Sequence, residues 1–247
     1  MNKSTSGMPV FSKKGMIPTL NNMGFMFEWL DPYAEEFIEH AASLDGEVLE
    51  VGCAFGVVTL RALEKGARIC ACDMEPRHLE FLQSKVPPAQ RSRLRCVAAT
   101  LPEADFPENA FAAIFSSRVL HFMNGDDIEA SVSKMFRWVE PCGKVILVAD
   151  TPYNGIWRDF APTYEANKKA GEKWPGYIDD CAAYIPKRSK NVILPPFMNF
   201  LDPDIMRRVC EEAGFIVERT SFEDRPASEQ GTGNDHVGIV AVKPERG

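Results

Sequence analysis

A glycine-containing turn follows an apolar stretch that itself carries a carboxylate, and a second carboxylate ends the next apolar stretch. Residues 47–56 read EVLEVGCAFG, and Asp73 stands 23 residues after Glu50. Small residues at a turn between a strand and a helix let a ligand approach backbone N–H groups. A carboxylate at the end of the following strand is placed to accept hydrogen bonds from two vicinal ribose hydroxyls. Together these residues predict a nucleoside site at the carboxyl edge of a parallel sheet.

The carboxylate inside the first stretch separates two classes of nucleoside ligand. A dinucleotide site has three glycines, spaced G-x-G-x-x-G, that let the backbone approach a pyrophosphate. Here Gly52 and Gly56 have Ala54 between them, and Glu50 precedes the turn. A carboxylate beside a pyrophosphate would repel it. Glu50 instead suits a cationic ligand such as S-adenosylmethionine, which carries an ammonium and a sulfonium group.

Short apolar stretches alternate with helical patterns between residues 47 and 150, which predicts parallel strands joined by crossover helices. The predicted strands are EVLEVG (47–52), RICACD (68–73), RLRCVA (93–98), AFAAIFSS (110–117) and KVILVAD (144–150). The predicted helices cover residues 56–65, 76–85 and 126–139, and a further helix starts at Asp31-Pro32 and runs to about Ser43.

The alternation stops after Asp150 for about fifty residues rich in aromatic side chains, a segment too long for an ordinary connection. It resumes at Asp202-Pro203 with a helix that ends at Gly214. Two final strands follow, FIVERTSF (215–222) and HVGIVAV (236–242).

Two further motifs stand near the ends of predicted elements, FSSRVLH at 115–121 and VEPCGKV at 139–145. With residues 50–56 and the strand end at Asp73, they resemble the class I S-adenosylmethionine-dependent methyltransferases. The resemblance covers roughly residues 45–150, with weaker support from 202–243. It implies an α/β fold: a doubly wound, seven-stranded, mostly parallel, Rossmann-like sheet with an antiparallel final hairpin strand.

The resemblance also divides the chain into four parts and assigns a cofactor. Residues 1–30 would form a flexible lead and cap segment, and residues 31–150 the S-adenosylmethionine-binding core. Residues 151–200 would be a substrate lid inserted after the fifth strand; a packing subdomain that forms no lid is the alternative. Residues 201–247 would complete the core with a helix and a strand hairpin.

Site residues are carried over onto matching positions. By resemblance, Glu50 and the backbone of residues 52–56 hold the methionine end, Asp73 the ribose, and Met74 one face of the adenine. Thr100 is an adenine candidate because Ala99-Thr100 stands where the family often has Gly-Asp. The implied cofactor-binding set is Glu50, Gly52, Cys53, Ala54, Gly56, Asp73, Met74, Thr100, Leu101, Ser116 and Ser117.

His121 follows the predicted fourth strand, where the methyl group and the acceptor meet in this fold. A histidine there could deprotonate an acceptor hydroxyl or amine; alternatively, it caps or packs a loop. Methyl transfer from a sulfonium is an in-line displacement that depends mainly on positioning, so few acid or base residues are needed. The predicted acceptor-binding residues are Phe27, Tyr153, Trp157, Tyr164 and Trp174.

The composition excludes several classes of protein. The chain has 247 residues, 45% hydrophobic and 26% charged, which excludes a collagen, a coiled coil or a disordered chain. The net charge of −7 disfavours a nucleic-acid partner. No stretch reaches the roughly 18 apolar residues of a membrane span, and residues 1–16 contain no signal-peptide core, so we expect a cytoplasmic protein.

Cysteine usage predicts reduced thiols and no metal. The seven cysteines are an odd number, and Cys70 and Cys72 lack two further ligands at metal spacing.

The leading hypothesis from the motifs is a methyltransferase that acts on an oxygen or nitrogen of a small-molecule acceptor. A non-catalytic nucleoside-binding or sensing protein is the alternative. An RNA or protein methyltransferase is disfavoured by the charge and by the missing Asn-Pro-Pro signature.

Overall fold

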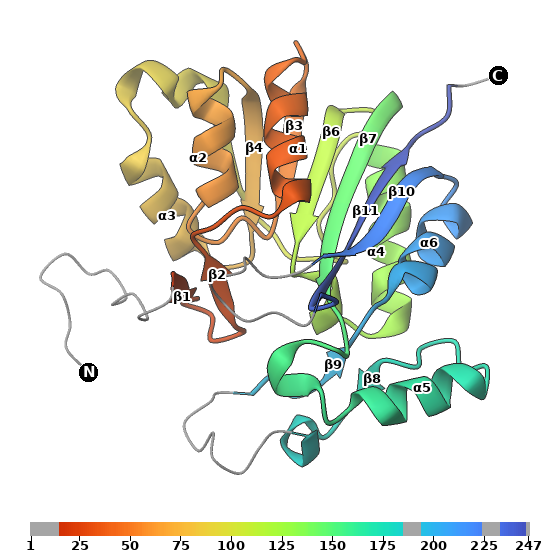
Figure 1. Cartoon of the computed structure of the whole chain (residues 1–247). Helices are drawn as coiled ribbons and strands as arrows, with labels where there is room; N and C mark the ends of the chain where they lie inside the picture. Colours follow the sequence, from red (N-terminus) through yellow and green to blue (C-terminus); the bar gives the residue numbers. More distant parts are fainter. Residues whose placement is uncertain (1–14, 185–193, 224–232, 246–247) are drawn as a thin grey trace, which may run out of the picture.

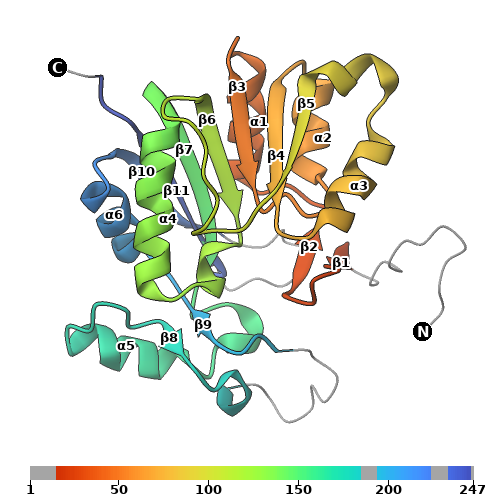
Figure 2. The same ribbon diagram turned by 180° about the vertical axis from the view of Figure 1, so that it is seen from behind.

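The computed structural model describes residues 15–184, 194–223 and 233–245, and its centre is a seven-stranded sheet between two layers of helices (Figures 1 and 2). The strand order is β10-β11-β7-β6-β3-β4-β5, and β11 runs antiparallel to both of its neighbours. The remaining pairs are parallel. This topology confirms the predicted doubly wound, mostly parallel sheet. The strands are β3 (Glu47–Val51), β4 (Arg68–Asp73), β5 (Leu94–Ala98), β6 (Phe111–Ser117), β7 (Val139–Asp150), β10 (Ile216–Glu223) and β11 (His236–Val242).

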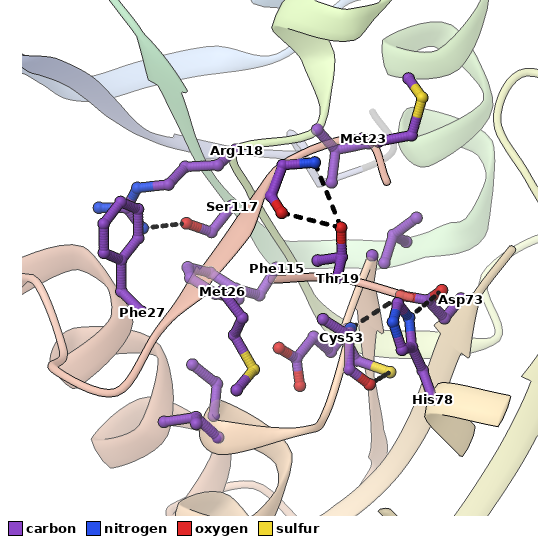
Figure 3. Close-up of a pocket in the computed structure, with 18 of the residues that line it drawn as sticks. Thr19, Met23, Met26, Phe27, Cys53, Asp73, His78, Phe115, Ser117 and Arg118 are labelled. Carbon is purple, nitrogen blue, oxygen red and sulfur yellow. Dashed lines mark hydrogen bonds and ion pairs between the residues drawn. The ribbon is translucent and has the colours of Figure 1, made fainter. Parts of the chain in front are cut away.

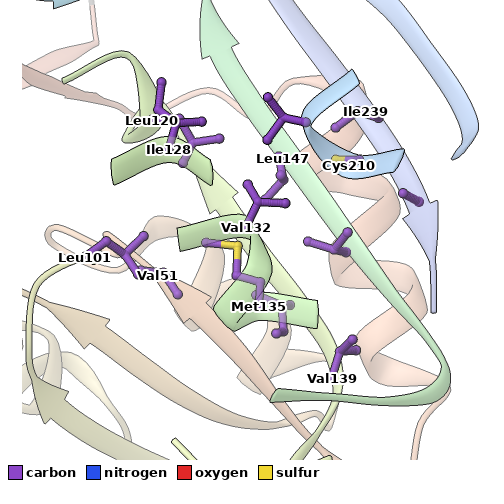
Figure 4. Close-up of a cluster of buried hydrophobic side chains, with 14 of the residues drawn as sticks. Val51, Leu101, Leu120, Ile128, Val132, Met135, Val139, Leu147, Cys210 and Ile239 are labelled. Carbon is purple, nitrogen blue, oxygen red and sulfur yellow. The ribbon is translucent and has the colours of Figure 1, made fainter. Parts of the chain in front are cut away.

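Alternate residues of the strands pack against helices on opposite faces. Val48 lies in the core under α1, α2 and α3, whereas its neighbour Leu49 lies in the core under α4 and α6. Figure 4 shows the second core, where Val51 of β3 lies near Val132 and Met135 of α4. The helices are α1 (Pro32–Ala42), α2 (Val57–Glu64), α3 (Pro76–Lys85), α4 (Gly125–Trp138) and α6 (Pro203–Glu212).

The predicted helix starts are confirmed by their caps. The Asp31 carboxylate accepts a hydrogen bond from Ala34 N at 2.8 Å, and the Asp202 carboxylate accepts one from Ile205 N at 2.9 Å. One boundary was wrong: β7 begins at Val139, not at residue 144. The register of β6 against β7 shifts there, which accommodates turn-forming residues within a strand.

Two smaller parts lie at the carboxyl end of the parallel strands (Figures 1 and 2). Residues 15–30, here called the strap, form a hairpin of β1 (Met16–Pro18) and β2 (Phe25–Phe27). Residues 1–14 of the predicted flexible lead, and 185–193 and 224–232, lie outside the described residues. The insertion after β7 contains 3-10 helices η3 (Gly155–Trp157) and η4 (Cys181–Tyr184), helix α5 (Ala161–Lys169), and strands β8 (Tyr177–Ile178) and β9 (Met198–Asn199).

The insertion has a hydrophobic core of its own, so it is a packed subdomain. Trp157, Phe160, Tyr164 and Phe200 are buried together in it. Within the described ranges, no helix is long and apolar enough to cross a membrane.

Candidate active site

A cavity of about 290 Å³ lies beneath the strap, at the carboxyl ends of β3, β4 and β6 (Figure 3). Its walls come from the glycine turn after β3, the ends of β4 and β6, and the strap. All the predicted cofactor-binding residues except Gly56 and Ser116 line it. The structure therefore brings most of this set together around one hollow.

The glycine turn is shaped by backbone conformations that favour glycine. Gly52 has a φ of +76°, and a Cβ there would lie 2.3 Å from Val119 Cγ2. Ala54 also adopts a positive φ, 45°, which costs a non-glycine residue some strain. Gly56 has a φ of +80° and a Cβ there would lie 2.5 Å from Leu82 Cδ1. Gly56 therefore serves the start of α2 and its packing rather than the cavity wall.

Asp73 is buried and its carboxylate is largely occupied by the protein. Oδ2 accepts a hydrogen bond from Ala54 N at 2.7 Å, and Oδ1 accepts one from Glu75 N at 2.9 Å. The His78 ring contributes a third contact, 3.0 Å from its Nδ1 to Oδ1. Because a carboxylate offers about four acceptor positions, about one remains, on Oδ2. That position can accept a ribose hydroxyl.

Glu50 is buried on β3 and faces the same cavity. Its Oε2 accepts a hydrogen bond from the Thr59 hydroxyl. Burial raises the pKa of Glu50 to about 8, despite the opposing effect of the Thr59 hydrogen bond. The carboxyl group is therefore mainly neutral at pH 7, and a cation placed beside it would favour its ionised form.

The predicted adenine residues all line the cavity but differ in exposure. Met74 is 53% exposed, and Thr100 and Leu101 line the cavity beside it. An exposed apolar side chain at a cavity mouth is suited to contact with a flat ring. Ser117 lines the cavity, whereas the Ser116 hydroxyl donates to Val51 O at 3.1 Å. Ser116 thus joins β6 to β3 and contributes no wall.

Arg118 is a cavity residue that the sequence reasoning missed. Its guanidinium carbon lies 4.8 Å from the ring centre of Phe27 and 5.1 Å from that of Trp29, and Nη2 lies 3.0 Å from Asp31 Oδ2. Among the described residues that line the cavity, Arg118 is the only lysine or arginine. The residue belongs to the FSSRVLH motif, but its contacts depend on how the strap folds back. That information is not in the local pattern.

The predicted acceptor-binding residues lie in three places: the cavity, the insertion and the surface of the main core. Phe27 lines the cavity from the strap. Trp157 and Tyr164 lie in the core of the insertion, and the Tyr153 hydroxyl donates to Glu165. Trp174 packs partly buried against the main core. These four do not line the described cavity, so their role in acceptor binding stays a prediction.

His121 directly precedes Phe122, which lines the cavity, but His121 itself is not part of the cavity lining. The ring is buried, and its Nδ1 accepts a hydrogen bond from Asp150 N at 3.0 Å. Burial lowers the pKa of His121, so the ring is held in its neutral form. Since Nδ1 is an acceptor, the ring proton lies on Nε2. These contacts suit the alternative interpretation of a packing residue, and a role as general base stays a prediction.

The described residues contain no group of three or more His, Cys, Asp or Glu side chains that could hold a metal ion. Cys70 and Cys72 are buried, and burial raises the pKa of each thiol to about 12. Both are therefore protonated thiols in the core.

Known proteins give independent information on the fold. The first structure, a SAM-dependent methyltransferase from Methanosarcina mazei, has a TM-score of 0.67 at 14% identity, covering 88% of this chain and 100% of that one. A second structure is a 1,6-didemethyltoxoflavin-N1-methyltransferase from Burkholderia thailandensis with 1,6-didemethyltoxoflavin and S-adenosylhomocysteine bound. Its TM-score is 0.60 at 18% identity, and the match covers 87% of this chain and 78% of that one. The glycopeptide N-methyltransferase MtfA, complexed with S-adenosylmethionine, has a TM-score of 0.58 at 18% identity, covering 85% and 86%.

The sequence comparison agrees with these structural likenesses. No curated protein sequence matches the chain. Residues 48–143, which contain the glycine turn, Asp73 and the FSSRVLH motif, match the family model of the methyltransferase domain. These findings support an enzyme that uses S-adenosylmethionine. Residues 48–143 therefore match a methyltransferase domain, and the chain shares the fold of S-adenosylmethionine-dependent methyltransferases of known structure, in agreement with the family that its motifs resemble.

Proposed function

We propose that this methyltransferase transfers the methyl group of S-adenosylmethionine to an oxygen or nitrogen of a small-molecule acceptor. Three buried carboxyl groups line the cavity; Asp31 is paired with Arg118, and the other two carry the proposal. Glu50 and Asp73 both line it, and the turn that begins at Gly52 lies between them along the wall. Two carboxyl groups match a ligand that has cationic groups at one end and a ribose in its middle.

Different residues of the cavity lining would bind different parts of the cofactor. Glu50 would face the cationic methionine end, Asp73 a ribose hydroxyl, and Met74 with Thr100 and Leu101 the adenine. The bound cofactor supplies an electrophilic methyl group on a sulfonium. The chain's own residues bind, orient and exclude water, which suits a displacement that depends on positioning.

The acceptor would lie at the apolar part of the cavity, between the strap and the end of β6. Phe27, Trp29, Phe122 and Met123 are apolar residues of the cavity lining, and the ion pair of Arg118 with Asp31 lines it too. Pockets for small organic molecules are mainly apolar with few polar groups. The three structural neighbours named above include an enzyme with 1,6-didemethyltoxoflavin bound and a glycopeptide N-methyltransferase. The apolar side chains of the lining suit a compact organic acceptor beside the cofactor.

A non-catalytic protein that binds or senses the nucleoside is the second candidate. It is favoured by one observation: His121, the predicted general base, does not line the described cavity and its Nδ1 accepts a backbone hydrogen bond. Such a protein would bind S-adenosylmethionine without consuming it.

A transfer assay separates the two candidates. The protein is incubated with S-adenosylmethionine labelled in its methyl group and with pools from a metabolite library, and labelled products are identified by mass spectrometry. The methyltransferase proposal predicts label in a small-molecule product together with S-adenosylhomocysteine. Binding of the cofactor with no transfer to any pool would favour the sensing protein. An inactive control is the Glu50→Gln variant, which should bind the cationic cofactor weakly.

A further inference from the structure

The strap covers the cavity, and its tip is attached to the first turn of α3. At the base of the tip, Thr19 N donates to Gly24 O at 3.0 Å. Leu20 follows, and its peptide group is bound on both sides. Leu20 N donates to His78 Nε2 at 2.9 Å, and Arg77 Nη2 donates to Leu20 O at 3.0 Å. Because Thr19 and Met23 of the strap line the cavity, this attachment fixes part of the cavity wall.

The same histidine contacts the predicted ribose ligand. His78 Nδ1 lies 3.0 Å from Asp73 Oδ1. Nε2 accepts from a backbone N–H, so it carries no proton, and the neutral ring must carry its proton on Nδ1. His78 therefore donates to Asp73 with one nitrogen and accepts from the strap with the other. Figure 3 shows Asp73, His78 and Thr19 around the cavity.

The ring of His78 has little freedom to turn. It is fully buried, and its centre lies 4.7 Å from that of Phe55 in an edge-to-face arrangement. A rigid donor fixes which Asp73 lone pairs the protein uses, and it leaves the open acceptor position on Oδ2. One rigid ring makes both hydrogen bonds. A shift in the position of the Asp73 carboxylate therefore moves the acceptor atom that Leu20 binds, and a movement of the strap shifts the donor that Asp73 binds.

We infer that His78 is a positioning residue that couples occupancy of Asp73 by a ribose hydroxyl to closure of the strap over the cavity. This inference rests on the proposed cofactor site. A ligand held by Asp73 fixes the carboxylate against His78 and thereby stabilises the contact with Leu20. By reciprocity, a strap that is held by His78 strengthens ligand binding by the same factor.

Two conservative variants separate the two hydrogen bonds. Asparagine places its amide near the position of Nδ1, so His78→Asn can donate to Asp73 but cannot reach Leu20. Glutamine places its amide near Nε2, so His78→Gln can accept from Leu20 N but loses the contact with Asp73. Arg77→Ala is a matched control that loosens Leu20 without touching Asp73. His40→Gln, on α1 outside the cavity lining, controls for replacement of a histidine.

The readouts are hydrogen exchange of the Leu20 amide and the affinity for S-adenosylhomocysteine, each on the full chain. In the parent protein, S-adenosylhomocysteine should slow exchange at Leu20 by about fivefold or more. His78→Gln should bind it about tenfold more weakly and show no ligand-dependent slowing. His78→Asn should exchange fast at Leu20 with or without ligand. In Arg77→Ala, the Leu20 amide should exchange faster than in the parent but should still be slowed by the ligand. In His40→Gln, both the exchange rate and the affinity should equal those of the parent.

The parent measurement alone can overturn the inference, even if a variant fails to fold. If S-adenosylhomocysteine binds and Leu20 exchange does not change, His78 does not couple the two sites. Parent-like affinity and slowing in His78→Gln would contradict it equally. If the parent does not bind S-adenosylhomocysteine at all, the proposed function fails, and this inference fails with it.

Discussion

Glu50 is placed to contact a cationic ligand, but its burial disfavours the ionised form of its carboxyl group. It is buried and accepts a hydrogen bond from Thr59, but no described residue forms a salt bridge with it. An unpaired buried carboxyl group favours its neutral form, which explains the pKa of about 8. A bound cation would supply the missing partner. The sequence predicted Glu50 and Asp73 because each lies in a short motif whose spacing alone defines it.

Affinity for S-adenosylmethionine should depend on pH through Glu50. In the empty cavity Glu50 is protonated below about pH 8, and the cationic ligand favours the ionised form. Binding near pH 7 should therefore release a proton, and affinity should rise as the pH approaches about 8. Titration calorimetry in buffers of different ionisation enthalpy measures the released proton. A pH-independent affinity with no proton release would contradict the prediction, and Glu50→Gln should abolish both effects.

The same group should affect the stability of the ligand-free protein. The folded-state pKa of Glu50 is raised from 4.5 to about 8, so unfolding releases its proton between these values. The free energy of unfolding should therefore fall as the pH rises from about 4.5 to about 8. Glu50→Gln, which stays neutral, should remove this part of the slope and be more stable than the parent at pH 8. Urea denaturation at a series of pH values measures it. An unchanged slope in the variant would refute the assignment.

Asp73 should contribute about one hydrogen bond to the cofactor rather than two. Its remaining acceptor position predicts that Asp73→Asn weakens S-adenosylhomocysteine binding by about 1.5 to 3 kcal/mol, or about 10- to 150-fold. Asparagine is preferred to alanine because its single amide oxygen can still accept from Ala54 N or Glu75 N, whereas alanine leaves both without an acceptor. Calorimetric titration is the measurement. Parent-like affinity in a folded variant would remove the ribose assignment.

The helices and strands were largely predictable, and the parts that cover the cavity were not. Capping residues such as Asp31 and Asp202 act within a few residues, so local sequence identifies them. The strap and the insertion depend on long-range contacts: Leu20 binds His78, 58 residues away. An aromatic-rich segment without helical or strand periodicity does not reveal whether its rings face a ligand or one another.

The insertion should behave mainly as a packed subdomain. Trp157 is 5% exposed and its ring centre lies 5.2 Å from that of Phe200. Trp157→Ala should lower the free energy of unfolding by about 3 to 5 kcal/mol through the cavity that it creates. It should leave S-adenosylhomocysteine affinity within about threefold of the parent, since 0.7 kcal/mol or less would be lost. Denaturant unfolding and titration of the same preparation test this. A large loss of ligand affinity with little loss of stability would instead support the predicted lid.

The complete fold places residues from distant parts of the chain at one edge of the sheet. The strap, which precedes α1 in the chain, lies at this edge, and the insertion begins there at the end of β7 (Figure 1). The family resemblance implied a mostly parallel sheet with an antiparallel final strand. The order of the strands came from the structure, because periodicity identifies strands but does not order them. The cavity itself required the structure, since Arg118 meets Phe27 and Asp31 only when the strap folds back.

Cofactor selectivity tests the central claim most directly, because it depends on the whole cavity and needs no knowledge of the acceptor. Isothermal titration of the parent protein with S-adenosylmethionine, S-adenosylhomocysteine and a nicotinamide dinucleotide compares ligands that share an adenosine. The first two should bind with one site per chain. The dinucleotide should show no measurable affinity, because the turn has Ala54 in place of the middle glycine of a pyrophosphate site and Glu50 offers the pyrophosphate no cationic partner. Dinucleotide binding tighter than that of S-adenosylmethionine would contradict the account.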